Sequence, residues 1–390
     1  MQYLLDKQLK EVVAYAHSKG VALKGDLPIG ISRTSADAWQ NPKLYNMDSQ
    51  AGAPPDAFSA DGQNWGFPTY NWENMAKDGY SWWKSRLNKM GQYFDAFRID
   101  HILGFFRIWE IPLQYKSGLM GHFNPAMPYH RSELEGRGFQ LKKAADTNTL
   151  FIEDPHEAGF FHPRISGQDT EEYRQLDQWH KDEYNRLYED FFYHRHNEFW
   201  KDTAMQKLPA LLNSTEMLAC GEDLGMIPSC VPEVMQDMRI LSLEIQRMPK
   251  AVGEEFADTT KYPYLCVCAT GTHDTSTLRA WWEEDPESSQ RYYNNVLDKT
   301  GKAPDTLTPE LAEDILARHL QSDAMFTILP LQDWLAIDGG LRYQGPVEEE
   351  RINVPANPRH YWRYRMHLSL EELLKADQFN GKMLRLSELR

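Results

Sequence analysis

Residues 94–100 read Phe-Asp-Ala-Phe-Arg-Ile-Asp, an apolar run that ends in two charged side chains. The run predicts a buried β-strand, and its period of two places Arg98 and Asp100 on the same face. A guanidinium beside a carboxylate favours the ionised carboxylate, which is the form that a nucleophile requires. A buried structural pair of Arg98 and Asp100 explains the same residues equally well. This run alone leaves both interpretations open.

The same arrangement of helix, short strand and polar residues recurs along the chain. A helix is predicted at 80–90, before this strand, and a first helix is predicted around Leu5 to Ala16, with Gly20 as its end. Further strands are predicted at 21–27, 217–220, 241–245, 265–269 and 326–329. This alternation is typical of a (β/α) barrel, whose functional residues lie at the carboxyl ends of the strands. The expected fold class is α/β, a TIM (β/α)8-type barrel.

One region interrupts this alternation. Residues 118–138 have loop composition, and residues 171–200 are predicted to be helical and rich in aromatic side chains that pack against the barrel. We therefore interpret 117–195 as a largely helical insertion subdomain, with 1–116 and 196–390 as the catalytic barrel portion.

Composition narrows the classes of partner. The chain has 390 residues and a formal net charge of −15, which argues against nucleic acid because phosphate binding needs clustered Lys and Arg. An acidic surface is compatible with a neutral sugar. The four cysteines form no CxxC pair, and no signal peptide or membrane-spanning run is visible. We expect reduced thiols, a cytoplasmic location and no membrane partner.

Two further strand ends carry carboxylates. Glu222 and Asp223 follow the predicted strand at 217–220, and crowding with Asp100 would raise the pKa of Glu222, which suits a proton donor. His273 and Asp274 follow the strand at 265–269 and could bind sugar hydroxyls. Alternatively, Asp274 caps a helix that begins near 276–277. Cleavage of a glycoside needs one ionised carboxylate and one carboxylic acid astride the anomeric carbon, and this pattern supplies both.

Other catalytic classes lack their motifs. The chain has no Gly-x-Ser-x-Gly elbow and no glycine-rich turn for a phosphate or dinucleotide. No metal-binding spacing is visible, and no cofactor is expected.

Eight separated motifs resemble, in order, the amylomaltase family, the 4-α-glucanotransferases of glycoside hydrolase family 77. They are Lys24-Gly25-Asp26-Leu27-Pro28-Ile29, Pro54-Pro55-Asp56-Ala57-Phe58-Ser59, Gly62-Gln63-Asn64-Trp65-Gly66, Arg98-Ile99-Asp100-His101, Gly104-Phe105, Trp109-Glu110-Ile111-Pro112, Glu222-Asp223-Leu224-Gly225 and Gly271-Thr272-His273-Asp274. The insertion is similar to that of one subgroup of the family.

The resemblance implies roles for particular residues. Asp100 would be the nucleophile, Glu222 the general acid/base and Asp274 the stabiliser of the transition state. The residues expected to bind substrate, or to contact the nucleophile, are Asp26, Asp56, Gln63, Trp65, Arg98, His101, Asp223 and His273. Maltose, malto-oligosaccharides and glycogen- or starch-like glucans are the implied donors and acceptors, and the reaction would be a retaining double displacement without a cofactor.

Three expectations complete this interpretation. The resemblance begins at the helix before the third barrel strand, so the first two strands are expected to be absent and the chain to be a C-terminal fragment with an incomplete barrel. An α-amylase-type hydrolase uses the same three carboxylates and remains an alternative. A catalytically inactive glucan-binding fragment is the other.

Overall fold

The computed structural model describes residues 1–55, 59–142, 146–355, 357 and 360–390. The chain folds as two compact units, Met1–Ile240 and Leu241–Arg390. Strands form at all six places where the sequence predicts them, which confirms the predicted alternation. Among the described residues, no helix is both long and apolar enough to cross a membrane.

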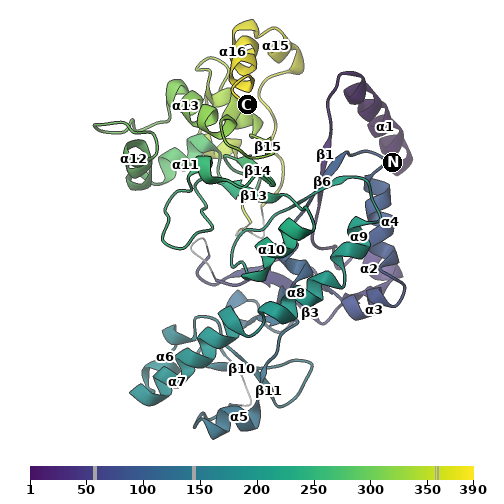
Figure 1. The fold of residues 1–390 in the computed structure, drawn as a ribbon, viewed down its shortest axis with the longest axis vertical. Helices are drawn as coiled ribbons and strands as arrows, with labels where there is room; N and C mark the ends of the chain where they lie inside the picture. The colour runs from purple at the N-terminus through teal and green to yellow at the C-terminus, as the bar shows by residue number, and fades with distance from the viewer. Residues whose placement is uncertain (56–58, 143–145, 356, 358–359) are drawn as a thin grey trace. The chain divides into compact units, whose positions relative to one another are not determined.

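The first unit is built around three parallel strands that lie side by side in the order β1-β6-β12 (Figure 1). The strands of this unit are β1 (Lys24–Leu27), β2 (Tyr45–Asn46), β3 (Ser49–Ala53), β4 (Gln63–Asn64), β5 (Thr69–Tyr70), β6 (Ala96–Ile99), β7 (Ile108–Pro112), β8 (His122–Asn124), β9 (Tyr129–His130), β10 (Phe151–Glu153), β11 (Phe160–Pro163) and β12 (Leu218–Gly221). Three antiparallel sheets accompany the parallel one among the described residues, with the orders β4-β3-β7-β8, β10-β11-β9 and β2-β5.

The first unit also contains ten α-helices among the described residues. They are α1 (Gln2–Ser18), α2 (Ala36–Gln40), α3 (Trp72–Ala76), α4 (Ser81–Met90), α5 (Arg131–Gly136), α6 (Glu171–Arg174), α7 (Gln178–Glu189), α8 (Asn197–Met205), α9 (Leu208–Leu212) and α10 (Cys230–Asp237), with 3-10 turns η1 (Pro42–Leu44), η2 (Ile102–Phe105), η3 (Gly118–Met120) and η4 (Gly167–Asp169) and the π-helix η5 (Asp190–His194). Phe97 and Ile99 of β6 are buried in one apolar cluster with Trp83 of α4 and Leu211 of α9. This packing fixes the strand that carries Asp100.

The region 117–195 differs in part from its predicted structure. Helices form as expected within 171–200, although they are broken at several points, and Phe191 and Phe192 are buried while Trp179 stays exposed. The segment 118–138 contains β8, β9 and α5, where loop was predicted. These strands are only two or three residues long, and pairing with residues distant in sequence stabilises them, so no local pattern marks them. The boundaries 117 and 195 of an insertion subdomain stay a prediction.

The second unit contains a second parallel sheet, with the order β13-β14-β15 (Figure 1). Its elements are β13 (Ser242–Ile245), β14 (Cys266–Ala269), β15 (Phe326–Thr327), α11 (Leu278–Glu284), α12 (Pro286–Asn295), α13 (Pro309–Leu320), α14 (Leu331–Ala336), α15 (Leu370–Leu374), α16 (Asp377–Ser387), η6 (Thr259–Lys261) and η7 (Val347–Glu350). Leu278, Trp282, Ile315 and Leu335 share one apolar cluster that packs the helices together.

Candidate active site

Parallel pairing places Asp100 and Glu222 side by side. Ile99 is paired with Gly221 at the ends of β6 and β12, so the residue that follows each strand emerges at the same level. Backbone hydrogen bonds continue this register: the Glu222 N–H donates to the Ile99 carbonyl at 2.9 Å, and the Ile102 N–H donates to the Glu222 carbonyl at 3.1 Å. Neighbouring strands lie about 4.8 Å apart. The two carboxylates that the sequence assigned to separate motifs therefore belong to one site.

Arg98 lies among three carboxylates. Its Nη1 donates to both oxygens of Asp26 at 2.8 Å and lies 3.1 Å from Oδ1 of Asp100, while Nη2 lies 3.7 Å from Oε2 of Glu222. The guanidinium is buried, with 11% of the side chain exposed. Burial alone would lower the pKa of Arg98, but Glu222, Asp26 and Asp100 outweigh this effect and raise it above its ordinary value. Arg98 is thus a fixed cation beside the proposed nucleophile.

Glu222 is suited to carry a proton near neutral pH. Burial raises the pKa of Glu222 to about 8, the Asp100 carboxylate adds to this rise, and Arg98 and the His101 N–H oppose it. The His101 N–H donates to Oε2 of Glu222 at 2.7 Å. His101 adopts a left-handed conformation, with φ of 44°, which costs roughly 1–3 kcal/mol for a residue other than glycine. The sharp turn after Asp100 thereby brings a backbone donor to Glu222.

Asp100 accepts hydrogen bonds from its surroundings. Besides Arg98, the backbone N–H of Ile29 donates to Oδ2 of Asp100 at 3.3 Å. Ile29 lies in the loop that follows β1, so all three strands of this sheet contribute to the surroundings of the two carboxylates. These donors favour the ionised form that attack on an anomeric carbon requires.

An aromatic group lies against His101. The indole ring of Trp65 meets the His101 ring edge-on with centroids 5.1 Å apart, and the Trp65 Nε1 donates to Oε1 of Gln63 at 3.0 Å. Burial lowers the pKa of His101 to about 3, with Arg107 and Arg98 contributing, so the imidazole is neutral. Gln63 and Trp65 thus lie beside His101, and their role in binding substrate stays a prediction. Asp223 is buried beside Glu222, and Asp56 lies outside the described residues.

In the second unit, Asp274 is held by polar partners. Its Oδ2 lies 3.1 Å from Nε2 of His273, and its Oδ1 accepts a hydrogen bond from Nδ2 of Asn353 at 2.6 Å. The His273 ring also packs on Trp362, with centroids 5.0 Å apart. No sequence pattern marks Asn353, because this contact joins residues distant along the chain. The alternative role of Asp274 as a helix cap is wrong: α11 is capped by Thr277, whose side chain accepts from the Ala280 N–H.

Arg247 fixes the loop that carries His273 and Asp274. The guanidinium donates to the Thr270 carbonyl at 3.0 Å, to Oγ1 of Thr275 at 3.0 Å and to the Ser276 carbonyl. A side chain at Gly271 would collide with Arg247 and Thr275. The glycine of the motif therefore makes room for the arginine that shapes this loop.

We expect loss of Arg98 to destabilise the first unit in a pH-dependent way. In Arg98→Gln, the carboxylates of Asp26 and Asp100 lose their cation. Breaking a fully buried pair costs about 3–5 kcal/mol, and the exposure of the Asp26 side chain (44%) and the Asp100 side chain (30%) makes the expected loss smaller. The loss should be present at neutral pH and shrink as pH falls, because protonated carboxyls need no cation. Urea unfolding near neutral pH and in mild acid measures this difference. Arg174→Gln, which removes an arginine with a 64% exposed side chain, is the matched control, and an equal effect of both variants would contradict the expectation.

Comparison with known proteins supports the assignment of these motifs. The family model described as 4-alpha-glucanotransferase, glycoside hydrolase family 77, matches residues 1–370. The chain is 40% identical to the 4-alpha-glucanotransferase DPE2 of Oryza sativa subsp. japonica, over 96% of this chain and 47% of that protein. It is 30% identical to a 4-alpha-glucanotransferase of Chlamydia pneumoniae, over 98% of this chain and 58% of that protein. The chain spans about half the length of these two curated relatives.

Solved structures give the same fold. The amylomaltase of Streptococcus agalactiae, determined in complex with acarbose, matches with a TM-score of 0.66 at 21% sequence identity. The match covers 100% of this chain and 60% of the amylomaltase. The amylomaltase of Corynebacterium glutamicum has a TM-score of 0.60 at 17% identity, over 99% of this chain and 49% of that one. These likenesses confirm the expected TIM-barrel-like α/β class. With its family model matched over nearly the whole length, the chain belongs to the 4-alpha-glucanotransferases of glycoside hydrolase family 77.

Proposed function

We propose that this chain transfers glucosyl units or α-1,4-glucan segments between malto-oligosaccharides and glucan acceptors by a retaining double displacement. The observation that supports it most is the carboxylate pair Asp100 and Glu222, level at the ends of two adjacent parallel strands and joined through Arg98. Family membership supplies the class of substrate, because the named relatives are 4-alpha-glucanotransferases.

In the first step, Glu222 donates its proton to the glycosidic oxygen while Asp100 attacks the anomeric carbon. The C–O bond to the leaving sugar breaks, and a β-linked glycosyl ester forms on Asp100. The raised pKa of Glu222, about 8, keeps this acid protonated at neutral pH. The cation of Arg98 and the N–H of Ile29 keep the nucleophile ionised.

In the second step, Glu222 acts as a base. It takes the proton from the hydroxyl of an incoming sugar, whose oxygen attacks the anomeric carbon and releases Asp100, so that the α configuration is restored. Transfer prevails over hydrolysis when the acceptor excludes water from the ester. We assign Asp274 the stabilisation of the transition state and His273 a sugar contact, as the family motif implies. Trp65 and Gln63 would line the subsites.

The proposed setting is the cytoplasm, with maltose, malto-oligosaccharides and glycogen- or starch-like glucans as partners. The four cysteines are buried and form no disulfide within the part of the chain that the structure describes, which supports a reducing compartment.

The products from maltose and glycogen test this proposal. The chain should release glucose from maltose and lengthen the outer chains of glycogen by a matching amount, and both changes should disappear in Asp100→Ala. Release of glucose without growth of glycogen would identify a hydrolase. Binding of glycogen by a folded chain without any products would identify an inactive glucan-binding fragment.

A further inference from the structure

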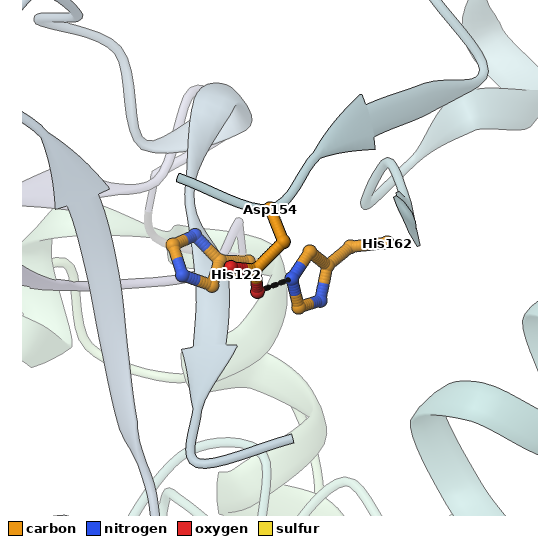
Figure 2. Close-up of side chains that lie close together, drawn as sticks. All are labelled: His122, Asp154 and His162. Carbon is orange, nitrogen blue, oxygen red and sulfur yellow. Dashed lines mark hydrogen bonds and ion pairs between the residues drawn. The ribbon is translucent and has the colours of Figure 1, made fainter. Parts of the chain in front are cut away.

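A buried cluster of metal-ligand side chains lies outside the carboxylate site. His122 on β8, Asp154 directly after β10 and His162 on β11 converge, and one ligand atom from each lies within 4.8 Å of the other two (Figure 2). Nε2 of His162 lies 2.7 Å from Oδ2 of Asp154, and the two imidazole rings are 4.6 Å apart between centroids. The sequence offers no hint of this cluster because its members come from separate segments.

Both imidazoles are buried with an unpartnered nitrogen. His122 is 3% exposed and His162 is 1% exposed, and the Nδ1 atom of each has no hydrogen-bond partner. A buried polar atom without a partner costs roughly 1–3 kcal/mol. Nε2 of His162, and not its Nδ1, faces Asp154, so an ion bound there leaves the cost at Nδ1 of His162 in place. A neutral imidazole has one nitrogen lone pair available for a metal ion.

The charge around the cluster is negative. Glu110, paired with His122 across β7 and β8, is fully buried. The Glu110 carboxylate accepts hydrogen bonds from Thr69 and Asn124 and lies 3.2 Å from Nε2 of His156. Oδ1 of Asp154 accepts hydrogen bonds from the backbone N–H groups of His156 and Glu157. The contacts of these two carboxylates are imidazoles, a hydroxyl, an amide and backbone N–H groups. A divalent cation would balance their charge.

We propose that His122, Asp154 and His162 bind one divalent transition-metal ion, with Zn²⁺ as the best match. Two imidazoles and one carboxylate are a donor set typical of zinc, with a fourth position for water. Zinc ligands lie about 2.0–2.2 Å from the ion, so the ion takes the place of the hydrogen bond between His162 and Asp154. The His162 proton then resides on Nδ1, and the Nε2 lone pair faces the ion. The three ligand atoms already lie within 4.8 Å of one another, so binding one ion requires only small shifts of these side chains.

The role of the ion is structural. His122 belongs to the edge strand of the sheet β4-β3-β7-β8, whereas His162 and Asp154 belong to the sheet β10-β11-β9. One ion bound to all three residues would connect the two sheets, and none of its ligands is among the residues assigned to sugar chemistry. The ion would therefore hold the sheet β10-β11-β9 against β8, the edge strand of the four-stranded sheet.

Metal binding to the intact, tag-free chain tests the proposal. After chelator treatment and dialysis, we expect one Zn²⁺ per chain in a titration against a competing chelator, a higher melting temperature with Zn²⁺, and intense visible absorption of four-coordinate Co²⁺. Even loss of an outer-shell partner weakens metal binding roughly 10–100-fold, so His162→Gln and Asp154→Asn should each weaken it by more than that.

The same Zn²⁺ titration and Co²⁺ spectrum provide the control and the results that would contradict the proposal. His194→Gln replaces an imidazole that is 64% exposed in the same region, and this variant should bind Zn²⁺ as the parent does. Weak binding of several ions, or equal affinity in His162→Gln and the parent, would overturn the proposal. If a variant fails to fold, the stoichiometry and Co²⁺ spectrum of the parent chain decide: no stoichiometric uptake and no such spectrum would refute the site.

Discussion

Replacing Asp100 by alanine should remove nearly all transfer between maltose and glycogen. The variant lacks the oxygen that forms the glycosyl ester, and loss of an essential group of a catalytic unit costs on the order of 10⁴–10⁶-fold in kcat. Oδ1 of Asp100 also lies 3.1 Å from Arg98, so the melting temperature must be measured beside the activity. The rate of glucose release from maltose, followed at saturating substrate, gives the effect.

Azide distinguishes loss of a nucleophile from general damage. In Asp100→Ala, azide can enter the space of the carboxylate and attack the anomeric carbon once, which gives a β-glycosyl azide. Asp95→Asn, at the opposite end of the same strand, is the matched control. The Asp95 side chain is hydrogen-bonded to the Leu23 N–H and to His17, far from the proposed nucleophile along the strand, so this variant should retain activity. Full activity of Asp100→Ala, or an azide product of α configuration, would contradict the assigned role.

Replacing Glu222 by glutamine should slow transfer from maltose by about 10²–10⁴-fold, the usual contribution of a general acid. The amide preserves the shape of the side chain but holds no transferable proton. An α-maltosyl fluoride needs no protonation because fluoride is a good leaving group. In the variant, the first turnover of this donor, measured as the burst of released fluoride before the ester is transferred, should therefore be far faster than the first cleavage of maltose. Equal losses with both donors would contradict a role in protonation.

The protonation of Glu222 also predicts how the rate of ester formation by the unsubstituted chain depends on pH. Glu222 must be protonated to donate, and its pKa is about 8, so the rate of ester formation should fall as pH rises through that value. This alkaline limb should vanish in Glu222→Gln with the fluoride donor. Glu216→Gln changes an exposed glutamate before β12 and should keep the limb. A parent profile that stays flat through this range would contradict the assignment.

The sequence predicted the parts of the fold that local patterns encode. Short apolar runs that end in polar residues located all six parallel strands, and with them Asp100, Glu222 and Asp274. The period of two correctly placed Arg98 on the same face as Asp100, although the additional contact of Arg98 with Glu222 depends on the register of β6 and β12. Such register is a property of the folded sheet and not of either segment.

Contacts between distant segments were not predictable. Asn353 reaches Asp274 from another part of the chain, and no pattern around residue 353 indicates this. The cluster of His122, Asp154 and His162 forms only when two antiparallel sheets meet. Strands as short as β8 and β9 lack a periodicity long enough to detect, which explains why 118–138 looked like loop. In each case, the missing information is tertiary.

Trapping the glycosyl ester tests the central claim most directly. The chain, and Glu222→Gln in parallel, would be incubated with a 5-fluoro α-glucosyl fluoride, which forms the ester but releases it slowly, and analysed by mass spectrometry of the intact protein and its peptides. We predict one added glycosyl group per chain, located on Asp100, and no such adduct in Asp100→Ala. An adduct on Asp26, Glu222 or Asp274, or turnover of maltose by a chain that never forms an adduct, would contradict the proposed mechanism.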